Sequence, residues 1–532
     1  MSSRIEALQR ALEKSHLMAA GFSYEELNRP LIAIANSYAE WQGHAHLRLL
    51  ADAVKMGVRN AGGTPIEFNT IALCDRLTGY REGMRYSLPS RDLIADSIEV
   101  FMRGQPIFEG LVLIASCDKI IPGMLMAMAR LDLPSIFVPG GVSIPLRKAA
   151  EASKKGKARK MFLEGKLLEP QLLDIIDDFY STPGACGELG TACTMQCVAE
   201  ALGVAIPGSA VAPATSSKLF RLAKKAGELI VNLARQGINA RTIMTKKAFE
   251  NAIMLVQAIG GSLNTVLHIP AIAKEAGFNI TYDDFEKLGK IVPLLCPVIP
   301  NGPYTVLDFY FAGGVPALMK RLEPMLNLNE RTVEGKSLLE VIRDVKVSDE
   351  RVILPLNRPL RKSGGIAVLK GNIAEIGGVV KSSAVPENML KFKGPARVYD
   401  KGEAFFKAIE RKEIKRGEVV VVRYEGMLGG PGMPELPGDF FNYVAEENAL
   451  ITDGRFSGTH YGLLVGYILP EAVQGGNLAF IEDGDLISID IKSRSINAEI
   501  SARELEERKK KVNIPKIHPE GFLRKWLISL SK

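Results

Sequence analysis

Three cysteines of the chain stand beside turns, where a thiol is available for chemistry instead of being packed in a core. Cys74 and Cys117 each follow an apolar run, and Cys186 lies in the segment Pro183-Gly-Ala-Cys186-Gly187. Thiolates gathered from separate loops bind soft metals or iron–sulfur clusters. The six cysteines show no Cys-x-x-Cys spacing, which argues against a structural zinc site. A single cysteine is more often a small buried hydrophobic residue, but the three together favour a metal or cluster site.

Carboxylates form a second candidate set. Asp75 and Asp118 each follow one of the strand-end cysteines directly, and Lys119 comes next after Asp118. Carboxylates at the ends of neighbouring strands would lie at one edge of a sheet, as a Mg²⁺ site requires, and Glu435 is a more distant candidate ligand. Lys119 would either neutralise these carboxylates or be modified to a carbamate and become a ligand itself.

Two glycine-rich segments stand out in the C-terminal half. The segment Arg423–Glu435 contains four glycines, which permit close approach of the backbone to a ligand, but it lacks the Lys-Ser/Thr ending of a phosphate-binding loop. The segment Leu450–Thr459 reads as a strand that ends in a small polar turn containing Ser457. This serine is not in a Gly-x-Ser-x-Gly motif, and the histidines form no His-Glu-x-x-His pair, so a hydrolase is disfavoured.

The surrounding sequence predicts the elements that hold these residues. Apolar, often β-branched runs alternate with segments of helical periodicity in the first 141 residues. The predicted strands are 30–36, 66–73, 111–115 and 135–139, and the predicted helices are 41–61, 90–102 and 125–131. Such alternation is typical of a parallel sheet covered by helices, in which polar residues at the strand ends meet at one edge. The pair Pro122-Gly123 predicts a turn after the third strand.

The pattern changes twice along the chain. Residues 216–345 are predominantly helical, and short β-branched strands with Gly or Asp turns recur after about residue 350. We therefore predict an α/β fold with two domains. Residues 1–350 would form an N-terminal parallel-sheet α/β domain with a helical extension, and residues 351–532 a C-terminal β-rich, barrel-like domain.

Composition excludes several classes of protein. The chain has 532 residues, 47% apolar and 24% charged, with a formal net charge of +7 and dispersed Lys and Arg, so we expect no nucleic-acid partner. The N-terminus has no signal-peptide core, and no apolar run is long enough to span a bilayer, so we expect no membrane partner. Sparse cysteines favour a reducing compartment. We therefore expect a cytoplasmic protein that acts on a small molecule.

The ordered motifs of this chain resemble the dihydroxy-acid dehydratase and sugar-acid (phosphogluconate) dehydratase family. The resemblance runs end to end and is closest to the dihydroxy-acid dehydratases. Its strongest motifs are Phe68–Ala72, Glu82–Ser97, Cys117–Ala127, Gly260–Asn264, Asp308–Gly314, Arg423–Glu435 and Thr452–Gly458. Three shorter segments look more like the sugar-acid branch, namely Gly190–Met195, Pro207–Ala210 and Ser457–Gly462.

The resemblance implies a hydro-lyase that removes water from a 2,3-dihydroxy carboxylate to give a 2-keto acid. It implies an iron–sulfur cluster with Cys117 and Cys186 as ligands, and a serine base, Ser457. It further implies a Mg²⁺ ion, a homodimer or homotetramer, and an active site in the cleft between the two domains. By motif, the Mg²⁺ ligands would be Asp75, Asp118, Glu435 and Lys119 as its carbamate.

The chain departs from the family pattern at two places. The subgroup with a cysteine directly before the His-x-His-Leu segment takes its third cluster ligand there, but this chain has Gly43. Cys74 becomes the candidate third ligand, and the cluster could be [2Fe–2S] or [4Fe–4S]. The loop after Asp75 carries two arginines, Arg76 and Arg81, which would suit a more polar or more anionic substrate.

The sequence is therefore compatible with three functions. The leading one is dihydroxy-acid dehydratase activity in valine and isoleucine biosynthesis. The alternative is an aldonic-acid dehydratase acting on gluconate- or xylonate-like substrates, since polyols need several hydrogen-bond partners whereas methyl groups need an apolar wall. A non-catalytic iron–sulfur protein is disfavoured, because a sensor needs neither Ser457 nor Glu435.

Overall fold

The computed structural model describes residues 4–79, 82–144, 158, 161–162, 165–179, 181–436 and 447–530. A four-stranded parallel sheet with the strand order β2-β1-β3-β4 forms the centre of the N-terminal part. The strands are β1 (Leu31–Asn36), β2 (Thr64–Asn69), β3 (Gly110–Ala115) and β4 (Ser135–Pro139). Strands β1, β3 and β4 are buried along their whole length, as expected of a parallel sheet covered by helices. The predicted N-terminal α/β architecture is confirmed.

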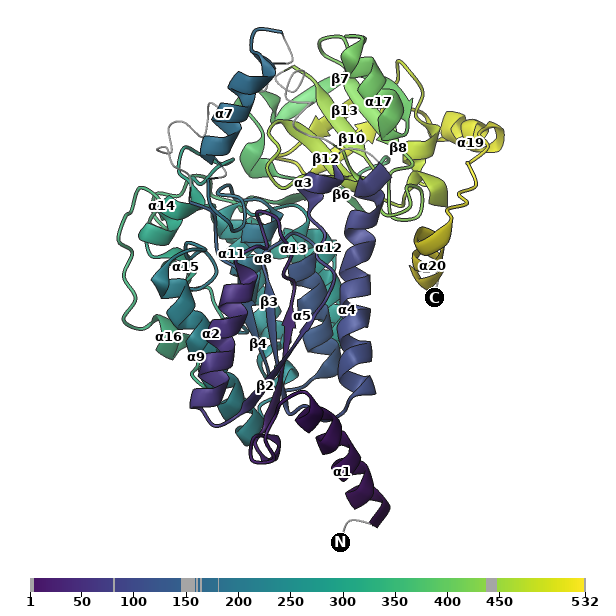
Figure 1. Cartoon of the computed structure of the whole chain (residues 1–532). Coiled ribbons are helices and arrows are strands. Elements are labelled where there is room, and N and C mark those ends of the chain that lie inside the picture. The colour runs from purple at the N-terminus through teal and green to yellow at the C-terminus, as the bar shows by residue number, and fades with distance from the viewer. Residues whose placement is uncertain are drawn as a thin grey trace.

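Two pairs of helices flank this sheet, as Figure 1 shows. One pair is α2 (Leu47–Asn60) with α9 (Ser217–Gln236), and the other is α4 (Ser87–Gly104) with α5 (Ile120–Leu131). A β-carbon on Gly57 would lie 1.9 Å from the carbonyl oxygen of Lys224, so only glycine lets α2 and α9 pack this closely. Because the four strands are parallel, their carboxyl ends lie at one edge of the sheet.

Two local predictions need correction. The second strand ends at Asn69 and not at Leu73, because β1, its neighbour among the described strands, ends at Asn36, whose carbonyl oxygen accepts a last hydrogen bond from Thr70 N at 3.0 Å. The turn predicted at Pro122-Gly123 is wrong, since both residues lie in the first turns of α5, where proline is tolerated. Gly123 serves close packing, because a β-carbon there would lie 2.5 Å from the carbonyl oxygen of Arg91 on α4.

A helical layer follows the first sheet in the chain. Its buried members α8 (Thr191–Ala201) and α11 (Lys246–Ile259) pack against each other and belong to the same hydrophobic core as the sheet. The other helices of this part are α3 (Asp75–Thr78), α7 (Glu169–Phe179), α10 (Ala240–Ile243), α12 (Thr265–Glu275), α13 (Tyr282–Ile291), α14 (Val306–Phe311), α15 (Gly314–Arg321) and α16 (Leu338–Ile342). The predicted helical extension is thus present.

The C-terminal part is an eight-stranded, barrel-like sheet with the order β14-β13-β7-β8-β10-β12-β6-β5. Its strands are β5 (Ala367–Leu369), β6 (Gly377–Val380), β7 (Lys391–Asp400), β8 (Val419–Arg423), β10 (Ala449–Thr452), β12 (Leu463–Leu469), β13 (Leu486–Asp490) and β14 (Ser495–Ala498). The two edges meet where Lys370 N donates to Arg494 O at 3.0 Å and Ile496 N donates to Lys370 O at 3.1 Å. The prediction of a β-rich, barrel-like fold is confirmed.

A separate two-stranded parallel sheet joins β9 (Glu435–Leu436) to β11 (Arg455–Phe456), in register Glu435 to Arg455. The remaining C-terminal helices are α17 (Gly402–Glu410), α19 (Ala502–Lys511) and α20 (Gly521–Leu530). Helix α20 returns to the N-terminal part, where Trp526 Nε1 donates to Asp92 Oδ2 at 2.7 Å. The two parts of the chain therefore contact each other at several places.

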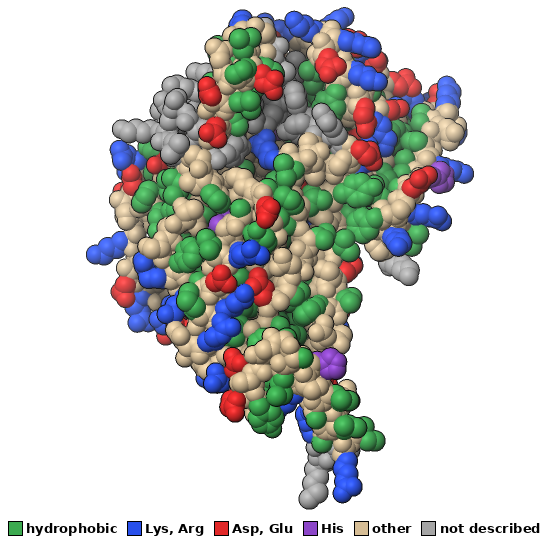
Figure 2. Space-filling view, viewed as in Figure 1, with side chains coloured by type: hydrophobic (Ala, Val, Ile, Leu, Met, Phe, Trp, Pro, Cys, Tyr) green, Lys and Arg blue, Asp and Glu red, His purple; other side chains and the backbone are tan. Residues whose placement is uncertain are grey.

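The N-terminal helix α1 (Arg4–Ala19) projects away from this body (Figure 1) and buries none of its residues. Hydrophobic side chains are visible on it in Figure 2, and Ile5 is 77% exposed. Among the helices of the described residues, none combines the length and the apolar character needed to cross a bilayer.

Candidate active site

A cavity of about 350 Å³ lies where the carboxyl ends of the N-terminal strands meet the β9–β11 sheet. This volume is within the usual range for a small-molecule site. Seven of the eight predicted site residues line it: Cys74, Asp75, Cys117, Asp118, Cys186, Glu435 and Ser457. The eighth, Lys119, is fully buried and contacts three of the seven. The structure thus brings the predicted set together.

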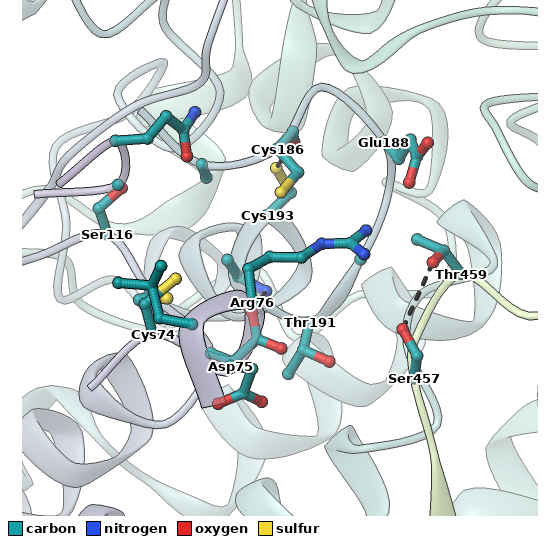
Figure 3. A pocket seen from close by; sticks show the side chains of 18 of the residues that line it. Cys74, Asp75, Arg76, Ser116, Cys186, Glu188, Thr191, Cys193, Ser457 and Thr459 are labelled. Carbon is teal, nitrogen blue, oxygen red and sulfur yellow. Dashed lines mark hydrogen bonds between the residues drawn. The ribbon is translucent and has the colours of Figure 1, made fainter. Parts of the chain in front are cut away.

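The three candidate thiols come from three separate loops. Cys74 precedes α3, Cys117 follows β3, and Cys186 lies before α8, all three partly exposed. The Cys117 thiol is hydrogen-bonded to Cys74, and this contact together with burial raises the pKa of the Cys74 thiol. Figure 3 shows Cys186 on another side of the cavity, beside Cys193. Three accessible thiols around one cavity are a donor set that fits an iron–sulfur cluster.

Cys193 has a supporting part in this arrangement. Its thiol is buried and donates to the carbonyl oxygen of Cys186 at 3.0 Å, which ties the Cys186 loop to α8. The interpretation of Cys193 and Cys197 as packing residues agrees with their burial in the core.

The three candidate carboxylates converge on one point. Asp75, Asp118 and Glu435 each offer an oxygen, and these oxygens all lie within 4.8 Å of one another. Asp75 is the first residue of α3, Asp118 follows β3, and Glu435 belongs to β9. Hard oxygen donors at this spacing fit a Mg²⁺ ion.

Lys119 lies among these carboxylates with no exposed surface. Its Nζ is 2.9 Å from Asp75 Oδ2, 3.5 Å from Glu435 Oε1 and 3.7 Å from Asp118 Oδ2. Burial alone would lower the pKa of Lys119, but these carboxylates, Asp75 foremost, raise it above its ordinary value. An ammonium on Lys119 would neutralise these carboxylates, which is one of the two roles that the sequence allows.

The pKa values of the two aspartates move in opposite directions. Burial raises the pKa of Asp118 to about 6, despite the nearby ammonium of Lys119. Burial would also raise the pKa of Asp75, but the charges of Lys119 and Arg455 outweigh it and hold that pKa below its usual range. Asp75 is thus the principal anion paired with Lys119.

Several supporting residues were not found by sequence reasoning. Ser87 Oγ donates to Asp75 Oδ1 at 2.6 Å, and the Ala192 N–H at the start of α8 donates to Asp118 Oδ1 at 3.1 Å. Asn264 Nδ2 donates to Glu435 Oε1 at 2.9 Å. Ser87 and Asn264 lie inside two of the motifs that carry the family resemblance, so these motifs could have indicated that both residues belong to the site. Their hydrogen-bond partners, Asp75 and Glu435, lie elsewhere in the sequence, however, and no local sequence pattern predicts these pairs.

Arg455 is the largest fully buried side chain of the site. Its Nη1 donates to Glu435 Oε1, and its Nε donates to the carbonyl oxygen of Met433 at 2.6 Å. The guanidinium thus orients the Glu435 carboxylate from behind, leaving Glu435 at the cavity wall.

Ser457 follows β11 and lines the same cavity as the thiols and carboxylates. Its Oγ lies 3.4 Å from Thr459 Oγ1, the contact drawn in Figure 3. His460 Nδ1 forms a hydrogen bond with the Ser457 carbonyl oxygen at 2.7 Å. A β-carbon on Gly458 would lie 2.5 Å from Ser262 Oγ, so glycine allows this turn to approach the N-terminal part. The turn presents the serine hydroxyl to the cavity.

The loop that departs from the family pattern also lines the cavity. Arg76 extends into it from α3, as Figure 3 shows, and Leu77 and Gly79 contribute to the wall. Arg81, the second predicted arginine, lies outside the described residues. Gly43 is a lining residue and offers no thiol.

Comparison with known proteins identifies the family on both halves of the chain. The profile for the N-terminal region of the dihydroxy-acid/6-phosphogluconate dehydratases matches residues 29–341, and the C-terminal profile matches residues 351–531.

Individual relatives are similar over nearly the whole length. A dihydroxy-acid dehydratase of Caldanaerobacter subterraneus subsp. tengcongensis is 46% identical, with 94% of this chain and 92% of the relative covered. One of Pyrococcus abyssi is 45% identical, with 98% and 96% covered. One of Methanococcoides burtonii is 44% identical, with 98% and 97% covered.

Proposed function

The chain belongs to the dihydroxy-acid/6-phosphogluconate dehydratase family, and from this premise we propose that it removes water from a 2,3-dihydroxy carboxylate to give a 2-keto acid. The single observation that carries the proposal is the convergence of three thiols, three carboxylates and Ser457 on one cavity. The proposed substrates are the dihydroxy acids that lead to valine and isoleucine, because the relatives above are named dihydroxy-acid dehydratases.

The proposal includes two cofactors, and the donor sets around the cavity support it. Cys74, Cys117 and Cys186 would hold an iron–sulfur cluster, of the [2Fe–2S] or the [4Fe–4S] type. Asp75, Asp118, Glu435 and the carbamate of Lys119 would hold Mg²⁺. When bound, these groups would supply a Lewis acid for the 3-hydroxyl and an anchor for the carboxylate of the substrate.

Lys119 has to change its charge for this assignment. Its ammonium lies among the carboxylates that would bind the cation, and two positive charges at one point repel each other. Loss of a proton from the ammonium and attack of the neutral amine on CO2, with release of a second proton, form an N–C bond and give a carbamate, which replaces the positive charge with a negative one and adds oxygen donors. The proposal therefore includes a carbamate on Lys119.

Ser457 is the proposed base. Its Oγ, as the alkoxide, accepts the C2 proton while hydroxide departs from C3, and the resulting enol tautomerises to the 2-keto acid. An unperturbed serine hydroxyl is a poor base, so nearby positive charge must stabilise the alkoxide and lower its pKa against the opposing effect of burial. Arg455 and Asn264, both buried, hold Glu435 in place during this step.

The alternative substrate class has one observation in its favour. Arg76 puts a guanidinium into the cavity, where methyl and ethyl substituents would prefer an apolar wall. An aldonic acid such as gluconate or xylonate, with several hydroxyls, would use that group. A non-catalytic iron–sulfur protein is disfavoured, because it would need neither Ser457 nor the carboxylates.

The test is anaerobic reconstitution with iron, sulfide and Mg²⁺, followed by keto-acid formation from 2,3-dihydroxyisovalerate and from gluconate in parallel. Turnover of 2,3-dihydroxyisovalerate is expected. Turnover of gluconate alone would establish the alternative. An intact cluster spectrum with no turnover of either acid would overturn the enzyme assignment.

Free thiols at a metal centre call for reducing conditions, so the proposal includes a cytoplasmic location. It also includes a homodimer or homotetramer, as in the family. Light scattering on the purified protein tests the second statement.

A further inference from the structure

The described part of the chain buries two lysines completely, Lys119 and Lys381. Lys119 is surrounded by three carboxylates. Lys381 directly follows β6. In the described part of the chain its Nζ makes one hydrogen bond, donated to the carbonyl oxygen of Gly458 at 3.1 Å, and has no carboxylate partner. The two buried amines therefore have opposite surroundings.

A buried ammonium without a counter-ion is unfavourable, and buried charges in proteins are normally paired. Burial alone accounts for the lowering of the pKa of Lys381, to about 7. The amine thus keeps a proton near neutral pH only with difficulty, unless an anion forms close to it.

The proposed reaction requires an alkoxide on Ser457. Ser457 is the residue directly before Gly458, whose carbonyl oxygen accepts the hydrogen bond from Lys381. The turn is also held by His460 at the Ser457 carbonyl oxygen and by close packing of Gly458 against Ser262. Lys381 does not line the cavity, so it acts from behind the turn and does not touch the substrate.

We propose that Lys381 is a positioning residue for Ser457, whose ammonium fixes the Gly458 carbonyl oxygen and whose unpaired positive charge stabilises the Ser457 alkoxide. This inference rests on the proposed function, in which Ser457 is the base. In the ionisation step the O–H bond of Ser457 breaks, its electron pair stays on Oγ, and the proton leaves to bulk solvent. Lys381 stays protonated because the new alkoxide is its counter-ion.

Two substitutions separate the charge from the hydrogen bond. Lys381→Met removes both, and Lys381→Gln keeps a neutral donor for Gly458. Lys370→Met is the matched control, because Lys370 is half exposed and its ion pair with Asp283 is on the surface. Each reconstituted protein is assayed for kcat across pH, for iron and cluster absorbance, and for its melting temperature.

Both Lys381 variants should lose kcat by about 10- to 100-fold, and the pKa on the acidic side of their pH profile should rise by about one unit or more. Iron content should be unchanged, and the melting temperature of Lys381→Met should not fall, because a lone buried charge is gone. The control should behave as the wild type.

Wild-type kcat and pH profile in Lys381→Gln would overturn the charge role, and wild-type activity in Lys381→Met would overturn the whole inference. If Lys381→Met fails to fold, the kcat and pH profile of Lys381→Gln alone test the inference. A wild-type protein that dehydrates neither acid contradicts the proposed function instead, so the two failures are distinguishable.

Discussion

Glu435 and Arg455 lie opposite each other on the two parallel strands β9 and β11, and the Arg455 guanidinium donates to the Glu435 carboxylate. Ser457 comes two residues after Arg455 on the same segment. One small sheet therefore places both a candidate metal ligand and the candidate base against residues from the N-terminal strand ends.

Substitution of Arg455 by Met should destabilise the cofactor-free protein. The change leaves the carboxylate of Glu435 buried with only part of its positive partners, which costs about 3–5 kcal/mol. Denaturant unfolding measures the loss. Arg416→Ala is the control, since Arg416 is 79% exposed and pairs with Glu447 on the surface, where an ion pair contributes about 1 kcal/mol or less. Equal effects of the two substitutions would contradict the importance of the buried pair.

Ser457→Ala should reduce kcat by a factor of about 10² to 10⁴, the usual contribution of a general base. The absorbance of the proposed cluster should be unchanged, because within the described ranges the hydroxyl has one hydrogen bond, the long 3.4 Å contact with Thr459. Single-turnover assays on the reconstituted protein measure the first effect, and visible absorbance the second. Loss of the cluster along with activity would refute the assignment as base.

Cys74→Ser should lower the iron content of the reconstituted protein, because the thiol faces the cavity beside Cys117. Cys296→Ser is the comparison, since Cys296 is fully buried in the hydrophobic core away from the cavity. It should lose stability and keep its iron. Iron analysis decides, and an unchanged iron content in Cys74→Ser would remove this residue from the ligand set.

Glu200 should make stability depend on pH. Burial raises the pKa of its carboxyl to about 7, although Gly208 N and Ala210 N donate to it at 2.6 and 2.8 Å. Because the folded-state pKa is raised, the stabilisation is complete below the unfolded pKa of about 4.3 and is lost as the pH rises through about 7.

The comparison variant for this effect is Glu200→Gln, which cannot ionise. The free energy of unfolding of the wild type, minus that of the variant, should fall by roughly 2 kcal/mol between pH 5 and pH 8. Denaturant titrations at both pH values measure it. A difference that stays constant or rises with pH would contradict the raised pKa.

Much of the fold could be predicted from the sequence because its elements have local signals. Four apolar β-branched runs and their helices predicted the parallel sheet, and the position of Cys117 and Asp118 after a buried run predicted their place at its edge. The end of β2 was misplaced because it depends on where its neighbour ends. The helical position of Pro122 was missed because proline is compatible both with a turn and with the start of a helix.

The candidate site could be predicted only where chemistry marked the residues. Thiol and carboxylate chemistry indicated the three cysteines, the two aspartates and Glu435, and the family motifs added the role of Ser457 as a base. The supports Ser87, Asn264 and Arg455 act through contacts between distant segments, which no local pattern encodes. The isolated burial of Lys381 is a property of the folded barrel and has no counterpart in composition or spacing.

The residues of the site come from two segments of the chain that are far apart in sequence. All three candidate thiols lie within the first 186 residues, whereas Glu435 and Ser457 come more than two hundred residues later. A nascent chain emerging from the ribosome therefore exposes its sulfur ligands well before the carboxylate and the serine that complete the pocket. The three proposed cluster ligands are therefore synthesised before Glu435 and Ser457, with which they share the pocket.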